Sequence, residues 1–124
     1  RLVGQKRGVE KAVYFSLATM LLNPGGVGLH VLDAFTAGIP LLTTGNALHG
    51  PEIAYLENEK NGVVTADSSS EYAEAINKII FQPEYLRSLN NAALQGSFDY
   101  SVENMASRFV DGMIACLRCE RRHA

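Results

Sequence analysis

Residues 21–44, LLNPGGVGLHVLDAFTAGIPLLTT, decide the fold of this chain. The stretch begins with a short apolar run, passes through a turn that contains Gly25, Gly26 and Gly28, and continues into an amphipathic segment. A second apolar run starts at Ile39 and is followed by threonines. This order predicts a strand, a turn, a helix and a second, buried parallel strand.

A glycine turn that opens a helix after a strand suits an anionic ligand. Glycine lets the ligand approach the backbone, and the first amides of a helix lack internal partners. Because these amides also carry the positive end of the helix dipole, a phosphate is the natural guest. A tight connection without any ligand remains the alternative. The spacing does not fit a dinucleotide fingerprint, since no third glycine follows Gly28 at the required distance.

The composition is that of a globular chain with at most one domain. It has 124 residues, of which 47% are hydrophobic and 19% charged, and its formal net charge is −2. This charge indicates neither nucleic-acid binding nor a polybasic membrane patch. No apolar run approaches the roughly 20 residues that span a bilayer, and no signal peptide is visible at the start.

Two cysteines, Cys116 and Cys119, form a C-x-x-C pattern in the last expected helix. A zinc site needs four ligands, and His123 is the one nearby candidate to join them. A redox motif would need a strand-to-helix turn, which is missing here. We therefore interpret the pair as small hydrophobic residues near a helix end and expect no metal.

The remaining patterns continue the alternation of strands and helices. We expect helices at 9–17, 29–37, 52–56, 68–80 and 83–96 and one that starts after Ser101, and strands at 20–22, 39–43 and 63–65. Ser68 and Glu71 form a capping box, and Gly38 and Gly96 each close a helix. Residues 1–4 look like the end of a strand that begins upstream. The pattern predicts an α/β sheet with C-terminal covering helices.

Apolar spacing predicts which face of each helix is packed. The predicted contacts are Leu29, Leu32 and Phe35 in the central helix, Tyr72, Ala75, Ile76, Ile79 and Ile80 in the next long one, and Val102, Met105, Phe109 and Met113 in the last.

Several short motifs, taken together, carry a family resemblance. They are PGGVGL at 24–29, LDA at 32–34, GIP at 38–40, TT at 43–44, HGPEI at 49–53, NGVV at 61–64 and YSVENMA at 100–106. In this order and spacing they resemble the C-terminal half of GT-B glycosyltransferases of family four, which includes sucrose and glycogen synthases.

The resemblance implies a fold and an activity. The family has two Rossmann-like domains across a cleft, and the C-terminal one binds the nucleotide-sugar donor. Residues 1–124 would be one partial domain with three main parallel strands, without the N-terminal acceptor domain or the first strands. The intact enzyme would transfer a sugar from a nucleoside diphosphate to a saccharide or lipid acceptor in bacterial polysaccharide or glycan biosynthesis. It would retain the anomeric configuration and need no metal or cofactor other than its donor substrate.

The resemblance also implies roles for the glycine turn. The backbone of Gly28 and Leu29, with the adjoining Gly26 and Val27, corresponds to the part that holds the donor diphosphate. We therefore expect these four residues to lie against the donor.

A pair of acidic residues, E-x7-E, is the family's usual donor-binding signature. Gly25 stands at the first glutamate, so no side chain there can touch the donor sugar. Asp33 stands at the second, which bonds the nucleotide ribose, and a carboxylate one methylene shorter can still accept from ribose hydroxyls. The alternative for Asp33 is a solvated helix residue.

Other polar residues have weaker assignments. Lys6 and Arg7 correspond to a loop near the nucleobase, and the alternative is a solvated basic loop. His49 and Glu52 match the loop before the short helix and are expected near the donor. His30 is expected to be an ordinary packed or surface histidine.

The family's arginine and lysine that stabilise the leaving diphosphate would precede Arg1. The isolated chain should therefore bind donor weakly and turn over nothing. Two alternatives remain open: a GT-B nucleotide-sugar epimerase, which would use His49 and Glu52, and a non-catalytic nucleotide-binding or interaction module.

The expected partners are the donor and the missing N-terminal domain, with no nucleic acid. The chain itself is expected to associate through the strand edge at 20–22 or through the last helix. We expect a cytoplasmic protein, peripheral at the inner membrane only through the missing domain.

Overall fold

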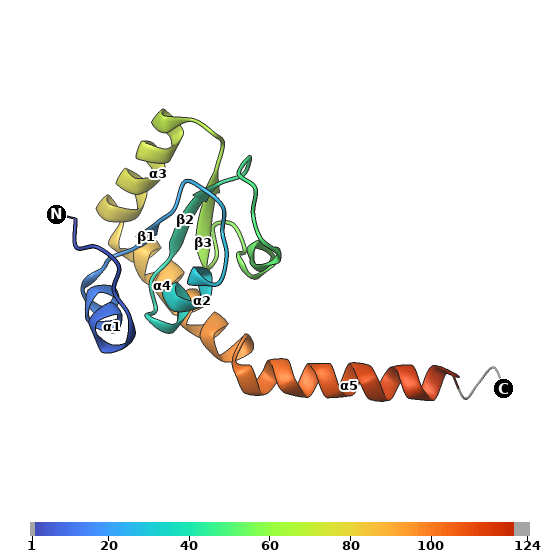
Figure 1. Cartoon of the computed structure of the whole chain (residues 1–124). Coiled ribbons are helices and arrows are strands. Elements are labelled where there is room, and N and C mark those ends of the chain that lie inside the picture. Colours follow the sequence, from blue (N-terminus) through green and yellow to red (C-terminus); the bar gives the residue numbers. More distant parts are fainter. Residues whose placement is uncertain (1, 121–124) are drawn as a thin grey trace.

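A computed structural model describes residues 2–120. Its elements in chain order are α1 (Gly8–Leu17), β1 (Leu21–Leu22), α2 (His30–Thr36), β2 (Leu41–Thr44), the 3-10 helix η1 (Pro51–Tyr55), β3 (Gly62–Thr65), α3 (Ser69–Phe81), α4 (Pro83–Asp99) and α5 (Val102–Glu120). The strands form one parallel sheet in the order β1-β2-β3 (Figure 1). The predicted α/β fold with a three-stranded parallel sheet is confirmed.

The central strand β2 is buried at every residue, as its continuous apolar run predicts. Successive side chains of a strand point to opposite faces, so Leu41 and Leu42 enter two separate clusters. Leu41 packs with residues of α2, among them Val31 and Phe35, on one face. Leu42 packs with α3 and α4 on the other face, so helices cover both sides of the sheet.

The packed face of α2 differs from the predicted one. The buried residues are Val31, Ala34 and Phe35, whereas Leu29 is 69% exposed and Leu32 only partly buried. The helix begins at His30, which leaves Leu29 as its N-cap on the open side of the turn. Phe35 is the one residue of the predicted set that is fully buried.

In α3 the predicted stripe is largely correct, with Ile79 buried and three of its neighbours partly buried against the same cluster. Ile80 is half exposed, so its assignment to the stripe was wrong. The expected strand at residues 1–4 is also not found, since the described residues 2–4 have no regular structure.

Gly96 does not end a helix, because α4 continues to Asp99. A Cβ atom at Gly96 would lie 2.9 Å from Cδ2 of Phe35, closer than real side chains approach. The glycine therefore lets α4 pack directly on the Phe35 ring, which also stacks on Tyr100 at 6.5 Å between ring centroids. The glycine at position 96 is therefore explained by close helix packing and not by the predicted helix end.

The other predicted helix-end residues, Gly38, Ser68 and Ser101, are confirmed. Gly38 has φ of +65°, as a left-handed residue after a helix requires. The Ser68 hydroxyl accepts from the Glu71 amide at 3.5 Å, and the Ser101 hydroxyl accepts from the Asn104 amide at 3.3 Å. These bonds satisfy amides that the first turns of α3 and α5 leave without helical partners.

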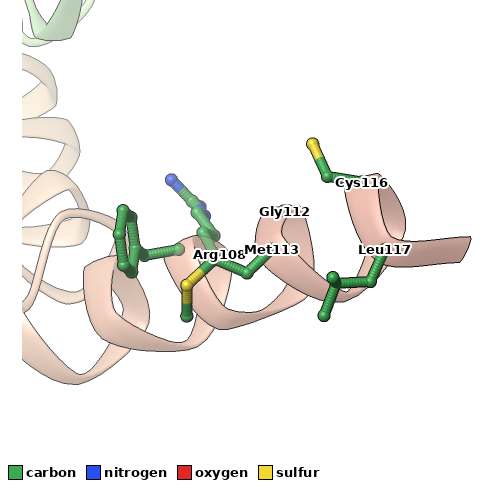
Figure 2. Close-up of a pocket in the computed structure, with 6 residues that line it drawn as sticks. Arg108, Gly112, Met113, Cys116 and Leu117 are labelled. Carbon is green, nitrogen blue, oxygen red and sulfur yellow. The ribbon is translucent and has the colours of Figure 1, made fainter. Parts of the chain in front are cut away.

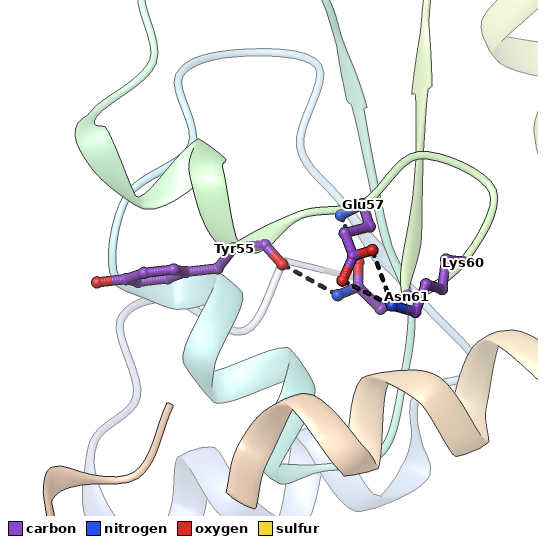
Figure 3. Close-up of polar contacts among 4 residues, drawn as sticks. All are labelled: Tyr55, Glu57, Lys60 and Asn61. Carbon is purple, nitrogen blue, oxygen red and sulfur yellow. Dashed lines mark hydrogen bonds and ion pairs between the residues drawn. The ribbon is translucent and has the colours of Figure 1, made fainter. Parts of the chain in front are cut away.

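The loop between η1 and β3 is tied by a buried asparagine (Figure 3). Asn61, only 3% exposed, accepts from the Glu57 amide at 2.8 Å and donates to the Tyr55 carbonyl at 3.0 Å. Lys60 forms an exposed ion pair with Glu57 at 2.7 Å. The buried asparagine, with its two backbone hydrogen bonds, stabilises the loop that leads into β3 more than the exposed ion pair does, because solvent screens the ion pair.

The last helix, α5, departs from the expectation of a covering helix. It extends away from the sheet domain (Figure 1), and all its described side chains from Val102 to Arg118 are exposed. Residues of this one helix, including Met113, Cys116 and Leu117, line an apolar depression of about 630 Å³ (Figure 2). Among residues 2–120, no helix is both long and apolar enough to cross a membrane.

Candidate functional site

The glycine turn lies beyond the carboxyl end of β1, where the chain passes from β1 into α2. The Asn23 amide donates to the Leu42 carbonyl at 2.9 Å and so extends the pairing of β1 with β2 by one residue. Parallel α/β sheets generally place ligands at the carboxyl ends of their strands. The turn predicted from the sequence therefore occupies the edge of the sheet where a site is expected.

Two threonines at the end of β2 hold the carbonyl groups of the turn. The Thr43 hydroxyl donates to the Gly25 carbonyl at 3.2 Å, and the Thr44 hydroxyl donates to the Pro24 carbonyl at 2.9 Å. Both threonines are buried. They form part of the family resemblance, but their side-chain partners could not be predicted from the sequence.

Asn23 holds the turn from its other end. Its side-chain oxygen accepts from the Gly25 amide at 3.3 Å, and its side-chain nitrogen donates to the Gly26 carbonyl at 2.9 Å. The same nitrogen lies 2.7 Å from Nε2 of His30. An asparagine before proline commonly forms such a turn, so this role could have been predicted. The fixed position of His30 could not.

His49 joins the turn to the loop that follows β2. Its Nδ1 accepts from the Val27 amide at 3.1 Å, and its Nε2 lies 2.8 Å from the Thr44 carbonyl oxygen. The neighbouring Gly50 amide donates to the Val27 carbonyl at 2.7 Å. Val27 is only 1% exposed, and both its amide and its carbonyl are hydrogen-bonded to the loop after β2.

The three glycines of the turn have different surroundings, and none has a positive φ. A Cβ atom at Gly26 would collide with the Leu48 carbonyl oxygen, so the loop after β2 blocks the one direction in which a side chain would project, although the residue is otherwise exposed. A Cβ atom at Gly28 would meet no atom within 4 Å, and one at Gly25 would make only an ordinary contact of 3.6 Å with Asn23. Open space is therefore present beside Gly28 and Gly25.

The start of α2 has donors available. No side chain caps its first turn, because the N-cap residue is Leu29. The first helical bonds come from the Val31 and Leu32 amides, at 3.1 and 3.0 Å. Within the described residues, the amides of Gly28 and Leu29 donate to no protein acceptor.

Asp33 lies in the first turn of α2 and has a partner that the sequence did not indicate. Its carboxylate accepts from Nζ of Lys11 at 2.7 Å, and both side chains are partly exposed. The pair lies in a groove of about 420 Å³ between α1 and α2, which is also lined by Phe15 and Thr36. Asp33 is therefore an ion-paired residue of a groove and not a freely solvated one.

The other predicted residues are not all brought together. Lys6 forms an exposed i,i+4 pair with Glu10 at 3.5 Å, and Arg7 is the exposed N-cap of α1. Among the described contacts, neither side chain reaches the turn or Asp33. Glu52 does lie beside the site, because a Cβ atom at Gly50 would collide with its carboxylate.

The cysteine pattern contributes no observed site. Cys116 is free and exposed, whereas the side chain of Cys119 and the whole of His123 lie outside what the structure describes. In the described part of the chain, no three His, Cys, Asp or Glu side chains gather as a metal site would need.

The chain matches no family model and no curated protein. Among solved structures it is similar to sucrose-phosphate synthase from Thermosynechococcus elongatus, with a TM-score of 0.76 and 21% sequence identity. The match covers 96% of this chain and 30% of that chain, so this chain spans less than a third of the length of the solved structure. The likeness shows that the chain has a GT-B glycosyltransferase-like fold.

Proposed function

We propose that this chain is the donor-binding half of a GT-B glycosyltransferase and that its glycine turn binds the diphosphate of a nucleotide sugar. The observation that carries the proposal is the braced turn. Its carbonyl groups are held by Thr43, Thr44 and Asn23, while the amides of Gly28 and Leu29 remain available beside open space. Donors held in place before binding lose little freedom when a phosphate arrives.

Asp33 would bind the ribose of the same nucleotide. It stands one helical turn after Leu29 and faces the groove between α1 and α2. A ribose would share or replace the contact from Lys11, a partly exposed ion pair of the kind that contributes about 1 kcal/mol or less. Lys6 and Arg7 would contact the nucleobase only after their loop moved toward the turn.

The donor sugar would be held mainly by backbone groups and by the other domain, because Gly25 has no side chain. In the intact protein, an N-terminal domain would bind a saccharide or lipid acceptor, and the exposed face of α5 would pack on that domain. Transfer would proceed with retention through positioning and neutralisation of the leaving diphosphate. The location we propose for it is the cytoplasm.

Calorimetry with uridine diphosphate and guanosine diphosphate tests the proposal. Asp33→Ala should weaken binding about tenfold or more, since hydrogen bonds to a charged group contribute about 1.5–3 kcal/mol. Lys11→Ala is the matched control, because it breaks the same ion pair but keeps the carboxylate, and should bind at least as tightly as the wild type. Equal affinities for all three proteins would remove Asp33 from the site.

The loss of the first glutamate at Gly25 favours one alternative, a nucleotide-binding module without catalysis. The full-length protein incubated with several nucleotide sugars distinguishes it from an enzyme. Hydrolysis or transfer of the donor sugar supports the glycosyltransferase, an epimerised product supports an epimerase, and binding without turnover supports the module. A wild-type chain that binds neither diphosphate at millimolar concentration would contradict the proposal itself.

A further inference from the structure

We propose that His49 is a positioning residue for the diphosphate turn and does not itself contact the donor. The inference rests on the proposed function and assigns a role within the same site. Its basis is that the imidazole ring lies between the turn and the end of β2 and is hydrogen-bonded to the backbone of both. Nδ1 is 3.1 Å from the Val27 amide nitrogen, and Nε2 is 2.8 Å from the Thr44 carbonyl oxygen.

These two partners define the protonation of the ring. A backbone N–H can only donate, so Nδ1 of His49 must be the unprotonated nitrogen. A backbone carbonyl can only accept, so Nε2 must carry the proton. His49 is therefore the neutral Nε2–H tautomer, and neither ring nitrogen remains free to bond a phosphate or a sugar hydroxyl.

The ring closes a circuit of hydrogen bonds around the turn. The Thr44 hydroxyl donates to the Pro24 carbonyl, the Thr44 carbonyl accepts from His49, and His49 accepts from the Val27 amide. Val27 stands between Gly26 and Gly28, and its two backbone groups are both bonded: His49 accepts from its amide, and its carbonyl accepts from the Gly50 amide at 2.7 Å. His49 thus holds the Gly26–Val27 peptide, and the Gly50 amide, on the residue next to His49, holds the Val27–Gly28 peptide that carries the Gly28 N–H. Together the two bonds fix the direction of the amides proposed to bind the diphosphate.

The nearby titratable residues, Glu52 and His30, do not hold the His49 ring in place. Glu52 packs against the Gly50 backbone, and His30 has Asn23 as its partner, so neither appears among the polar contacts of the His49 ring. The two backbone bonds are the polar contacts that the structure gives to this ring.

Three variants separate these bonds from the bulk of the ring. His49→Gln keeps one acceptor and one donor on a planar group, whereas His49→Leu fills similar space without either, and His49→Ala removes both. We expect His49→Leu and His49→Ala to bind uridine diphosphate about fivefold or more weakly, as the loss of the two positioning bonds implies, and His49→Gln to restore binding to within about twofold.

Leu89→Ala is the control for a general loss of stability. It removes a fully buried side chain of α4 that packs with Val63 and Ile79 on the face of the sheet covered by α3 and α4. Its affinity for uridine diphosphate should equal that of the wild type even where its melting temperature falls. Nitrogen-15 NMR of the wild-type ring should independently show the proton on Nε2 of His49.

The outcomes distinguish this inference from the function on which it rests. If the wild type binds uridine diphosphate and His49→Leu binds it equally well, the positioning role is overturned and the proposed function stands. If His49→Gln fails to restore binding while remaining folded, the hydrogen-bond explanation is overturned. If the wild type binds no nucleotide, the proposed function and the positioning role are both overturned. Should His49→Ala fail to fold, the Leu and Gln variants still decide.

Discussion

A pair of glycine substitutions tests the division of roles within the turn. Gly26 and Gly28 are two residues apart, but a Cβ atom would collide with the Leu48 carbonyl oxygen at the first and meet nothing within 4 Å at the second. Neither glycine has a positive φ, so an alanine causes no backbone strain at either position. The two variants add the same methyl group and differ only in its surroundings.

The structure gives the expected magnitudes. In Gly26→Ala the obstacle is backbone, which cannot rotate away, so we expect a loss of stability typical of overpacking, about 1–3 kcal/mol. In Gly28→Ala the methyl group points into open space, and the stability should change by no more than about 0.5 kcal/mol. The same methyl group would hold a phosphate away from the Gly28 and Leu29 amides and weaken nucleotide binding about tenfold or more.

Urea denaturation and calorimetry with uridine diphosphate measure the two effects separately. The expected pattern is a destabilised Gly26→Ala and a stable Gly28→Ala that binds poorly. A stable Gly28→Ala with wild-type affinity would refute the assignment of the diphosphate to this backbone. A Gly26→Ala protein as stable as the wild type would refute the close approach of the Leu48 carbonyl to this residue.

Three further predictions concern other parts of the chain. Burial raises the pKa of Tyr72, so its contribution to stability should be intact below about pH 10, the usual tyrosine value, and lost as the pH rises further. Tyr72→Phe should lower the free energy of unfolding by about 1 kcal/mol at neutral pH and show a shallower alkaline fall in melting temperature. Tyr85→Phe should not destabilise the protein, because within the described residues its buried hydroxyl has no hydrogen-bond partner. Equal losses of stability in the two variants would contradict this contrast. Gly25→Glu should fold normally, since its Cβ would make one ordinary contact, and should alter the preference among nucleotide sugars measured by calorimetry; an unchanged preference would count against a donor-facing position. Phe109, 68% exposed on α5, should drive self-association of the chain, so light scattering should find oligomers that Phe109→Asp abolishes, and a wild-type monomer at high concentration would exclude this.

Much of the fold could be predicted because its signals are local. The apolar run in β2 reports burial on both faces, and Gly38 and Ser68 report helix ends through backbone and hydroxyl chemistry that needs no distant partner. Most boundaries moved by no more than two residues, as in β1 and α2, whereas the end of α4 moved by three. Such signals identify elements well because their causes lie within a few residues.

The missed features depend on contacts between distant segments. Gly96 could be recognised as a packing glycine only once Phe35 was placed beneath it, 61 positions earlier in the chain. Lys11 gives no motif of its own, and its pairing with Asp33 follows from the way α1 lies against α2. The site residues named from family resemblance stay predictions until ligand binding is measured.

The bracing of the turn offers a physical reason why a glycine-rich segment can act as a binding element. Each ordered glycine costs about 0.5–1 kcal/mol more than alanine, so an unsupported turn with three of them would be mobile. The bonds from Asn23, Thr43, Thr44 and His49 each return a comparable net amount, about 0.5–1.5 kcal/mol. Glycine therefore provides access to the backbone, while the surrounding side chains provide the rigidity that glycine lacks. A turn built this way can present amide donors in a fixed direction even though Gly25 offers no side chain to a ligand.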